Sequence, residues 1–218
     1  MDFVYKFAPG RLPMTLLLLH GSGGDENDLL PIAGALAPGA AVLSPRGNVV
    51  QHGARRFFSY PGPDGFDADE VRQRVDELAD WIARMTTQYS LDPSRLYALG
   101  YSNGANTAAA TMLLRPGTIA GACLLRSRAV VTPSSLPDLN GAPVLISAGQ
   151  TDHLIPPSAA EALGQLLTSA GAHVDLAIQN AGHDLTPADF SLAKQWFETI
   201  TAATLRSTNH AGNLPDPA

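Results

Sequence analysis

The chain has 218 residues, a length that favours a single domain with one continuous core. Its net charge of -6 at pH 7 excludes the basic surface that nucleic-acid binding requires. The only cysteine, Cys123, excludes an internal disulfide framework and a multi-cysteine metal site. We therefore expect a cytoplasmic protein, with no nucleic-acid partner and no stable membrane insertion.

Short apolar runs alternate with longer amphipathic stretches along the chain, and Gly or Pro residues separate them. This alternation predicts an α/β fold, in which a mostly parallel, doubly wound sheet has helices on both faces. The run at 12–19 follows Lys6 and Arg11, but it is short and leads into a glycine loop, so it predicts a buried strand rather than a secretory signal. The predicted strands are 15–19, 41–44, 96–99, 120–125, 144–147 and 174–178; the predicted helices are 26–36, 69–89, 105–114, 158–170 and 187–200.

One domain over residues 1–204 accounts for all of these elements. The remaining residues, 205–218, are polar and contain proline, so we expect a flexible C-terminal tail.

The sharpest motif is the sequence GYSNG at positions 100–104, which has the G-x-S-x-G pattern. A predicted strand precedes it and a predicted helix follows it. This context is typical of a nucleophile elbow, in which the serine occupies a strained turn. We therefore predict that Ser102 is a nucleophile; the alternative is an ordinary turn with Ser102 near a helix N-cap.

A serine hydroxyl needs a general base, and in this motif an acid and then a histidine follow the serine along the chain. His183 follows the predicted strand at 174–178, so it lies at the same edge of the sheet as Ser102. Asp152 follows the strand at 144–147 at that same edge. We predict His183 as the base and Asp152 as the carboxylate that orients it.

Two backbone amides are placed to bind a developing oxyanion, those of Asn103 and, in the loop HGSGG at 20–24, of Ser22. His20 is interpreted as a structural hydrogen-bonding residue. The glycine loop lacks the lysine of a phosphate-binding P-loop, and no spacing of His, Asp and Glu suggests a metal site.

The segment RRFFSY at 55–60 combines aromatic and basic residues in a connection between elements. Phe57 and Phe58 are candidates for the wall of a substrate pocket, near Arg55 and Arg56. The alternative is a loop that two phenylalanines anchor in the core. The sequence does not decide between these two interpretations.

With these motifs in place, the chain resembles the phospholipase/carboxylesterase family of α/β-hydrolases, which also contains the acyl-protein thioesterases. The resemblance spans about residues 16–197 and includes LHGSGGDE at 19–26, SPRGN at 44–48, the elbow, GQTDHLIP at 149–156 and His183. The stretch RGN at 46–48 with RFF at 56–58 looks closest to the bacterial hydroquinone-type carboxylesterases.

The resemblance implies a lidless hydrolase of small, accessible esters, with no cofactor. The alternatives are a thioesterase or lysophospholipase-type deacylase and, more remotely, a non-catalytic receptor or scaffold. We expect Leu154 and Ile155 to contact the substrate. Homodimers are common in this family, so a homodimer is possible on resemblance alone.

Two features depart from the family pattern. Asn103 replaces the glutamine of the acyl-protein thioesterases, which leaves the backbone donor in place. Arg126 and Arg128, after the strand at 120–125, make that loop more basic than expected. Arginines near the pocket could favour an acidic or polar acyl group, so this departure leaves the substrate preference open, and the sequence does not assign a role to Arg55, Arg56, Arg126 or Arg128.

Overall fold

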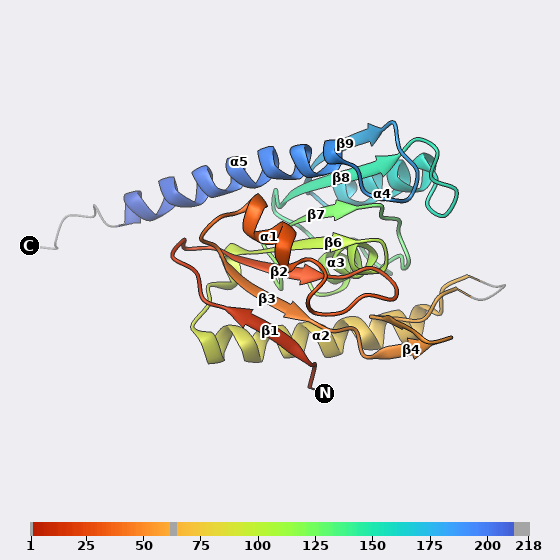
Figure 1. Cartoon of the computed structure of the whole chain (residues 1–218), viewed down its shortest axis with the longest axis horizontal. Coiled ribbons are helices and arrows are strands. Elements are labelled where there is room, and N and C mark those ends of the chain that lie inside the picture. The colour runs from red at the N-terminus through yellow and green to blue at the C-terminus, as the bar shows by residue number, and fades with distance from the viewer. Residues whose placement is uncertain (1, 62–64, 212–218) are drawn as a thin grey trace, which may run out of the picture.

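A seven-stranded sheet forms the centre of the protein (Figure 1). The structure, a computed structural model, describes residues 2–61 and 65–211, with only the backbone for 207–211. The strand order is β1-β3-β2-β6-β7-β8-β9, and only β1 runs antiparallel to its neighbour in this sheet. The strands are β1 (Tyr5–Ala8), β2 (Thr15–Leu19), β3 (Ala41–Pro45), β6 (Leu96–Tyr101), β7 (Gly121–Leu125), β8 (Pro143–Gly149) and β9 (His173–Gln179).

Helices cover both faces of this sheet, as the α/β prediction required (Figure 1). The apolar side chains of α1 (Leu30–Leu36) and α5 (Pro187–Ala211) pack together on one face. Those of α2 (Ala68–Tyr89), α3 (Asn103–Leu114) and α4 (Pro157–Ser169) form the core on the other. Every residue of β2 and of β7 is buried, which explains why these strands are unbroken apolar runs.

The long helix α2 shows how the sequence specifies an element. The carboxylate of Asp67 caps its N-terminus by accepting hydrogen bonds from the amides of Asp69 and Glu70. Its buried positions, from Val71 to Met85, follow helical spacing and face the sheet. Ser90, in a left-handed conformation, ends it.

Three expectations about the elements need correction. The edge strand β1 was not predicted, because its half-buried Tyr5 and Phe7 alternate with exposed residues instead of forming an apolar run. A small hairpin of β4 (Val49–Gln51) and β5 (Ala54–Arg56) was also missed. Helix α1 begins at Leu30 rather than at residue 26, because the preceding residues form a turn in which Asp25 accepts a hydrogen bond from the amide of Asn27.

The last helix is longer than predicted. Helix α5 continues past residue 200 to Ala211, so part of the expected tail is helical. Residues 212–218 of that tail lie outside the described residues. No helix in the described part of the chain is long and apolar enough to cross a membrane.

Candidate active site

Ser102 lies in a sharp turn between β6 and α3. Its backbone angles, φ 52° and ψ -114°, are strained for a residue with a side chain. The glycines on either side make this turn possible. A Cβ on Gly100 would come within 2.6 Å of the Cα of Ala105, and a Cβ on Gly104 would overlap the backbone of Leu19. The turn therefore has the geometry of the predicted elbow.

The structure brings Ser102, His183 and Asp152 together, although they come from three separate loops. The Nε2 atom of His183 lies 3.0 Å from the Ser102 hydroxyl, and its Nδ1 atom lies 2.8 Å from Oδ2 of Asp152. An ionised carboxylate only accepts hydrogen bonds, so Nδ1 carries the proton and Nε2 is left to accept from the serine hydroxyl. This is the arrangement in which the imidazole can remove a proton from Ser102.

Asp152 is buried and held rigidly. Its other oxygen, Oδ1, accepts hydrogen bonds from the amides of Leu154 and Ile155, at 2.8 and 2.9 Å. Backbone donors of this kind stabilise the ionised carboxylate. The carboxylate thus orients His183 from a fixed position.

A buried ion pair supports the loop that carries His183. The guanidinium of Arg126 donates to the carbonyl oxygens of Gly182 and Asp184, the two neighbours of His183. It also forms a bidentate pair with Asp189, and both side chains are fully buried. This corrects the expectation that Arg126 influences the choice of acyl group, since it has no exposed surface and all these hydrogen bonds are internal.

The two residues with the predicted amide donors, Ser22 and Asn103, line the same pocket as Ser102. Within the described part of the chain, none of the hydrogen bonds found uses the amide of Ser22 or that of Asn103. The loop of Ser22 is fixed by a hydrogen bond from the amide of Gly23 to the carbonyl of Arg55 and by one from Nε of Arg56 to the Ser22 hydroxyl, at 3.1 Å. Among the described residues, neither amide has a hydrogen-bond partner outside the helices and strands.

The side chain of Asn103 has a different role from its amide. It is buried, where its Oδ1 accepts from the amide of Phe57 at 2.8 Å and its Nδ2 donates to the carbonyl of Phe58 at 3.2 Å. Asn103 thus joins the elbow to the loop at 57–58.

His20 fills the structural role expected of it. The amide of Gly47 donates to its Nε2, so Nδ1 carries the proton and donates to the carbonyl of Gly21. Burial lowers the pKa of His20, which favours the neutral ring. His20 is thereby occupied in tying the end of β2 to the loop after β3.

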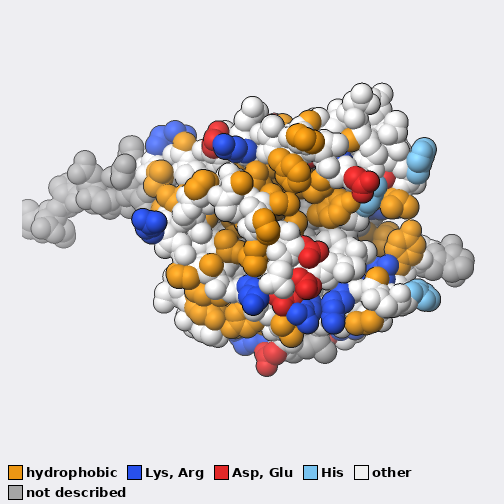
Figure 2. All heavy atoms as spheres, in the orientation of Figure 1, with side chains coloured by type: hydrophobic (Ala, Val, Ile, Leu, Met, Phe, Trp, Pro, Cys, Tyr) orange, Lys and Arg blue, Asp and Glu red, His pale blue; other side chains and the backbone are white. Residues whose placement is uncertain are grey.

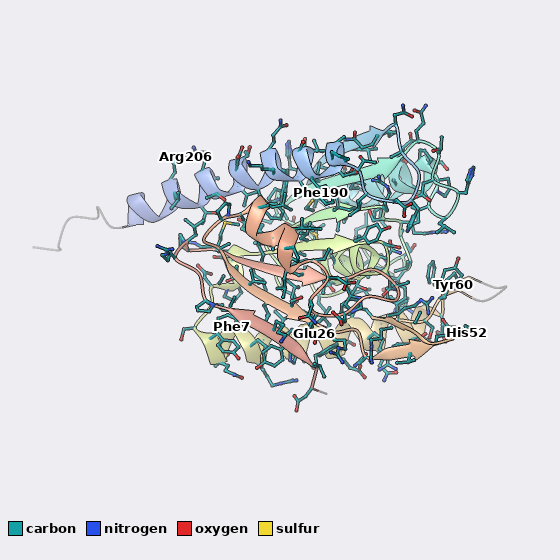
Figure 3. All side chains as sticks on the ribbon, in the orientation of Figure 1. Phe7, Glu26, His52, Tyr60, Phe190 and Arg206 are labelled. Carbon is teal, nitrogen blue, oxygen red and sulfur yellow. The ribbon has the colours of Figure 1, made fainter. Side chains whose placement is uncertain are left out.

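A narrow pocket of about 70 Å³ opens at Ser102. The described residues that line it are Ser22, Tyr60, Pro61, Phe66, Ser102, Asn103, Asn106, Arg128, Leu154, Ile155 and His183. Leu154 and Ile155, which were expected to contact the substrate, line this pocket. Tyr60, more than half exposed, lies at the end of the molecule toward which the parallel strands point (Figure 3).

Phe57 and Phe58 were expected as substrate contacts, and the structure corrects this expectation. They are 3% and 1% exposed and belong to the core rather than to the pocket lining. Their backbone hydrogen bonds to Asn103 hold them inward. The alternative interpretation, a loop anchored in the core, is the one that the structure shows.

Phe66 and Asn106 line the pocket and were missed, and Tyr60 is the residue of the segment 55–60 that lines it in place of the two phenylalanines. Asn106 lies one helical turn after Ser102. Its side-chain oxygen Oδ1 accepts a hydrogen bond at 2.8 Å from the backbone amide of Arg128. The G-x-S-x-G motif could have indicated this residue, because positions four apart share one face of a helix. Nothing in the local sequence marks Phe66.

Other candidate groups lie elsewhere. Cys123 is fully buried, and burial raises the pKa of its thiol, so it is not a nucleophile. The described residues contain no group of His, Cys, Asp and Glu that could hold a metal ion.

Comparisons with known proteins show the family to which the chain belongs. The chain belongs to the Phospholipase/Carboxylesterase family, which matches residues 11–201. MhqD of Bacillus subtilis (strain 168), whose name describes it as a hydrolase, is 35% identical over 91% of this chain and 98% of its own length. The carboxylesterase of Bacillus cereus is 36% identical, with a TM-score of 0.86 over 89% of this chain and 93% of that one.

A third relative is YahD, whose structure was solved with malic acid. It is 29% identical, with a TM-score of 0.84 over 91% of this chain and 98% of that one. The fold is therefore that of the α/β-hydrolases, without a large lid, and the chain is a member of a hydrolase family.

Proposed function

We propose that this protein hydrolyses carboxylic esters, with Ser102 as nucleophile, His183 as general base and Asp152 as the orienting carboxylate. The observation that carries the proposal is the unbroken line of hydrogen bonds from Asp152 through His183 to Ser102. This line ends in a strained elbow beside an open pocket. These hydrogen bonds direct Nε2 of His183 toward the Ser102 hydroxyl and Nδ1 toward the carboxylate, as proton removal from a serine requires.

In the first half of the reaction, the Ser102 oxygen attacks the ester carbonyl while His183 takes the hydroxyl proton. The amides of Ser22 and Asn103 bind the negative charge that develops on the carbonyl oxygen. Donors of this kind each contribute about 100- to 1000-fold in rate. His183 then gives its proton to the leaving alcohol, and an acyl group remains on Ser102.

In the second half, His183 removes a proton from water, which attacks the acyl group. The acid product leaves when the proton returns to Ser102. Asp152 keeps the imidazole in the same tautomer throughout and stabilises its charged form.

The size of the pocket supports small substrates. A pocket of about 70 Å³ next to Ser102 accommodates a short acyl group, and a long chain would extend into solvent.

Steady-state hydrolysis of p-nitrophenyl esters, from acetate to long-chain esters, tests this proposal. We expect wild-type activity to be highest with short chains and to fall by several orders of magnitude in Ser102→Ala and His183→Ala. Ser191→Ala, an exposed serine on α5, serves as the matched control and keeps full activity. Equal activity in wild type and Ser102→Ala would overturn the proposal.

A second measurement separates loss of the nucleophile from loss of the fold. A fluorophosphonate should add covalently to the wild type, and intact-mass analysis should show no addition to folded Ser102→Ala. The matched thioester, assayed in the same series, decides whether the same residues also accept a thiol leaving group.

A further inference from the structure

The active-site pocket carries a single permanent charge among the described residues that line it, and that charge is positive. It belongs to Arg128, which follows β7. The described lining contains no Asp or Glu. A neutral ester needs no such group, so the presence of a guanidinium beside Ser102 calls for an explanation.

The contacts of Arg128 do not explain it. Its backbone amide donates to Asn106, and its guanidinium carbon lies 5.7 Å from the centre of the Phe66 ring. Its Nε atom is buried and has no hydrogen-bond partner among the described residues. Within the same part of the chain, no carboxylate lies within ion-pair distance of Arg128.

Arg126, two residues earlier, shows the contrast. All three nitrogens of its guanidinium donate hydrogen bonds inside the protein, two of them to Asp189. A buried N–H group without an acceptor destabilises the folded protein. The guanidinium of Arg126 is therefore fully used inside the fold, whereas Arg128 lines the pocket and forms no ion pair among the described residues.

A second guanidinium adds to the positive charge at the pocket. Arg56 lies 5.5 Å from the centre of the Tyr60 ring and donates to the Ser22 hydroxyl, so it contacts two residues of the lining. It does not itself line the pocket. In Figure 3, Tyr60 marks this end of the molecule.

We propose that the preferred substrates are esters that carry a carboxylate a few carbon atoms from the reacting carbonyl, and that Arg128 binds this carboxylate. The inference rests on the proposed function and specifies its substrate class. The planar guanidinium matches a carboxylate with two parallel hydrogen bonds, and such charged bonds are stronger than neutral ones. Phe66, Leu154 and Ile155 supply apolar contacts for the short carbon chain between the two groups.

The test compares anionic esters with neutral esters of the same shape. On the acyl side, monomethyl glutarate is compared with methyl 5-methylhexanoate, in which an isopropyl group replaces the carboxylate. On the alcohol side, 3-acetoxypropanoate is compared with 3-methylbutyl acetate. Acid release at constant pH gives kcat/KM for each, and a preference for the anionic ester of at least about tenfold is expected in one of the two pairs.

Variants connect this preference to Arg128. In Arg128→Gln, which keeps hydrogen-bonding groups but removes the charge, we expect the ratio of anionic to neutral kcat/KM to fall to about one, through KM for the anionic ester. Arg128→Lys should keep part of the ratio, because the charge remains without the planar fork. Arg72→Gln, which removes an exposed charge on α2, is the matched control and should leave the ratio unchanged.

Two outcomes overturn the inference. One is a wild-type ratio near one in both pairs, and the other is a ratio that Arg128→Gln leaves intact. Neither outcome contradicts the proposed function. That function is tested in the same experiment by hydrolysis of the neutral esters and by its loss in Ser102→Ala. Failure of the proposed function would instead appear as neutral-ester hydrolysis that is independent of Ser102.

Discussion

The guanidinium of Arg126 and the carboxylate of Asp189 form a fully buried ion pair, with bonds of 2.7 and 2.8 Å, next to the loop that holds His183. The same carboxylate accepts hydrogen bonds from Ser147 and Thr186, and the same guanidinium donates to the carbonyls on both sides of His183. The pair therefore connects β8, the start of α5 and the histidine loop. We expect the pair to stabilise the folded protein and to hold the imidazole of His183 in position.

Asp189→Asn should lower the free energy of unfolding by about 3–5 kcal/mol, because it leaves the buried charge of Arg126 uncompensated. Urea unfolding at neutral pH measures this loss. The double variant Arg126→Met/Asp189→Leu should recover much of the stability, since an apolar pair replaces the ion pair. It should not recover ester hydrolysis, because the carbonyls of Gly182 and Asp184 lose their donors. Full recovery of both would show that the pair does not position His183.

The pH dependence of stability tests the same pair. Burial raises the pKa of Asp189, but hydrogen bonds from Arg126, Ser147 and Thr186 outweigh burial and hold it below its ordinary value. A lowered pKa in the folded state gives stability that is present above the unfolded-state pKa of about 3.9 and is lost as the pH falls through the folded-state value. Wild type should therefore lose stability in acid more steeply than Asp189→Asn. Curves that stay parallel as the pH falls from about 5 to about 2 would contradict this.

A second ion pair, between Glu26 and Arg46, joins the loop after β2 to the end of β3. The two hydrogen bonds from Arg46 lower the pKa of Glu26 from 4.5 to about 2. Figure 3 shows Glu26 on the front face, and Figure 2 shows acidic and basic side chains side by side in that region. The pair fixes the loop that carries Ser22.

Glu26→Gln should reduce stability by roughly 1 kcal/mol at pH 7, because it removes a partly exposed ion pair. The pKa of Glu26 is lowered in the folded state, so its contribution is complete above about pH 4.5 and disappears toward about pH 2. The difference between wild type and Glu26→Gln in urea unfolding should shrink over that range. Glu161→Gln, an exposed carboxylate on α4, is the control and should show no such pH-dependent difference.

The side chain and the amide of Asn103 can be separated by mutation. Asn103→Ala keeps the amide but leaves the Phe57 amide without its acceptor, which should cost about 1–3 kcal/mol in unfolding free energy. Because the proposed oxyanion donor is the backbone, labelling of Ser102 by a fluorophosphonate should continue at a rate within about tenfold of wild type. A loss of 100-fold or more with unchanged stability would assign the oxyanion contact to the side chain instead.

The sequence was most informative where the determinants are local. The elbow is a continuous motif whose glycines are required by contacts within a few residues or with the adjacent strand. The positions of Asp152 and His183 follow from the rule that the carboxyl ends of parallel strands share one edge. The elbow and the two residues that follow it in the candidate site could therefore be predicted without a structure.

Contacts between residues far apart in the chain could not be predicted from the sequence. Arg126 and Asp189 lie 63 positions apart, and nothing in either neighbourhood indicates that they meet. From the sequence alone, Phe57 and Phe58 could line a pocket or lie in the core, because the burial of a loop residue depends on how the surrounding elements pack against it. The strand β1 was missed since an edge strand alternates apolar and polar residues and needs no unbroken run.

The last prediction concerns Gly104, which lies in the elbow against the backbone of Leu19 at the end of β2. At Gly104 an added Cβ would overlap the Leu19 carbonyl, which is backbone and cannot turn away. Gly104→Ala should therefore lose at least about 4 kcal/mol of stability or fail to accumulate as soluble protein, since such a clash strains both β2 and α3. Gly34→Ala is the matched control: Gly34 lies in α1 with nothing within 4 Å of the added Cβ, and alanine there should raise stability by about 0.5–1 kcal/mol. Thermal unfolding of both variants measures the contrast, and a Gly104→Ala protein that melts at the wild-type temperature would show that the elbow and β2 can move apart without cost.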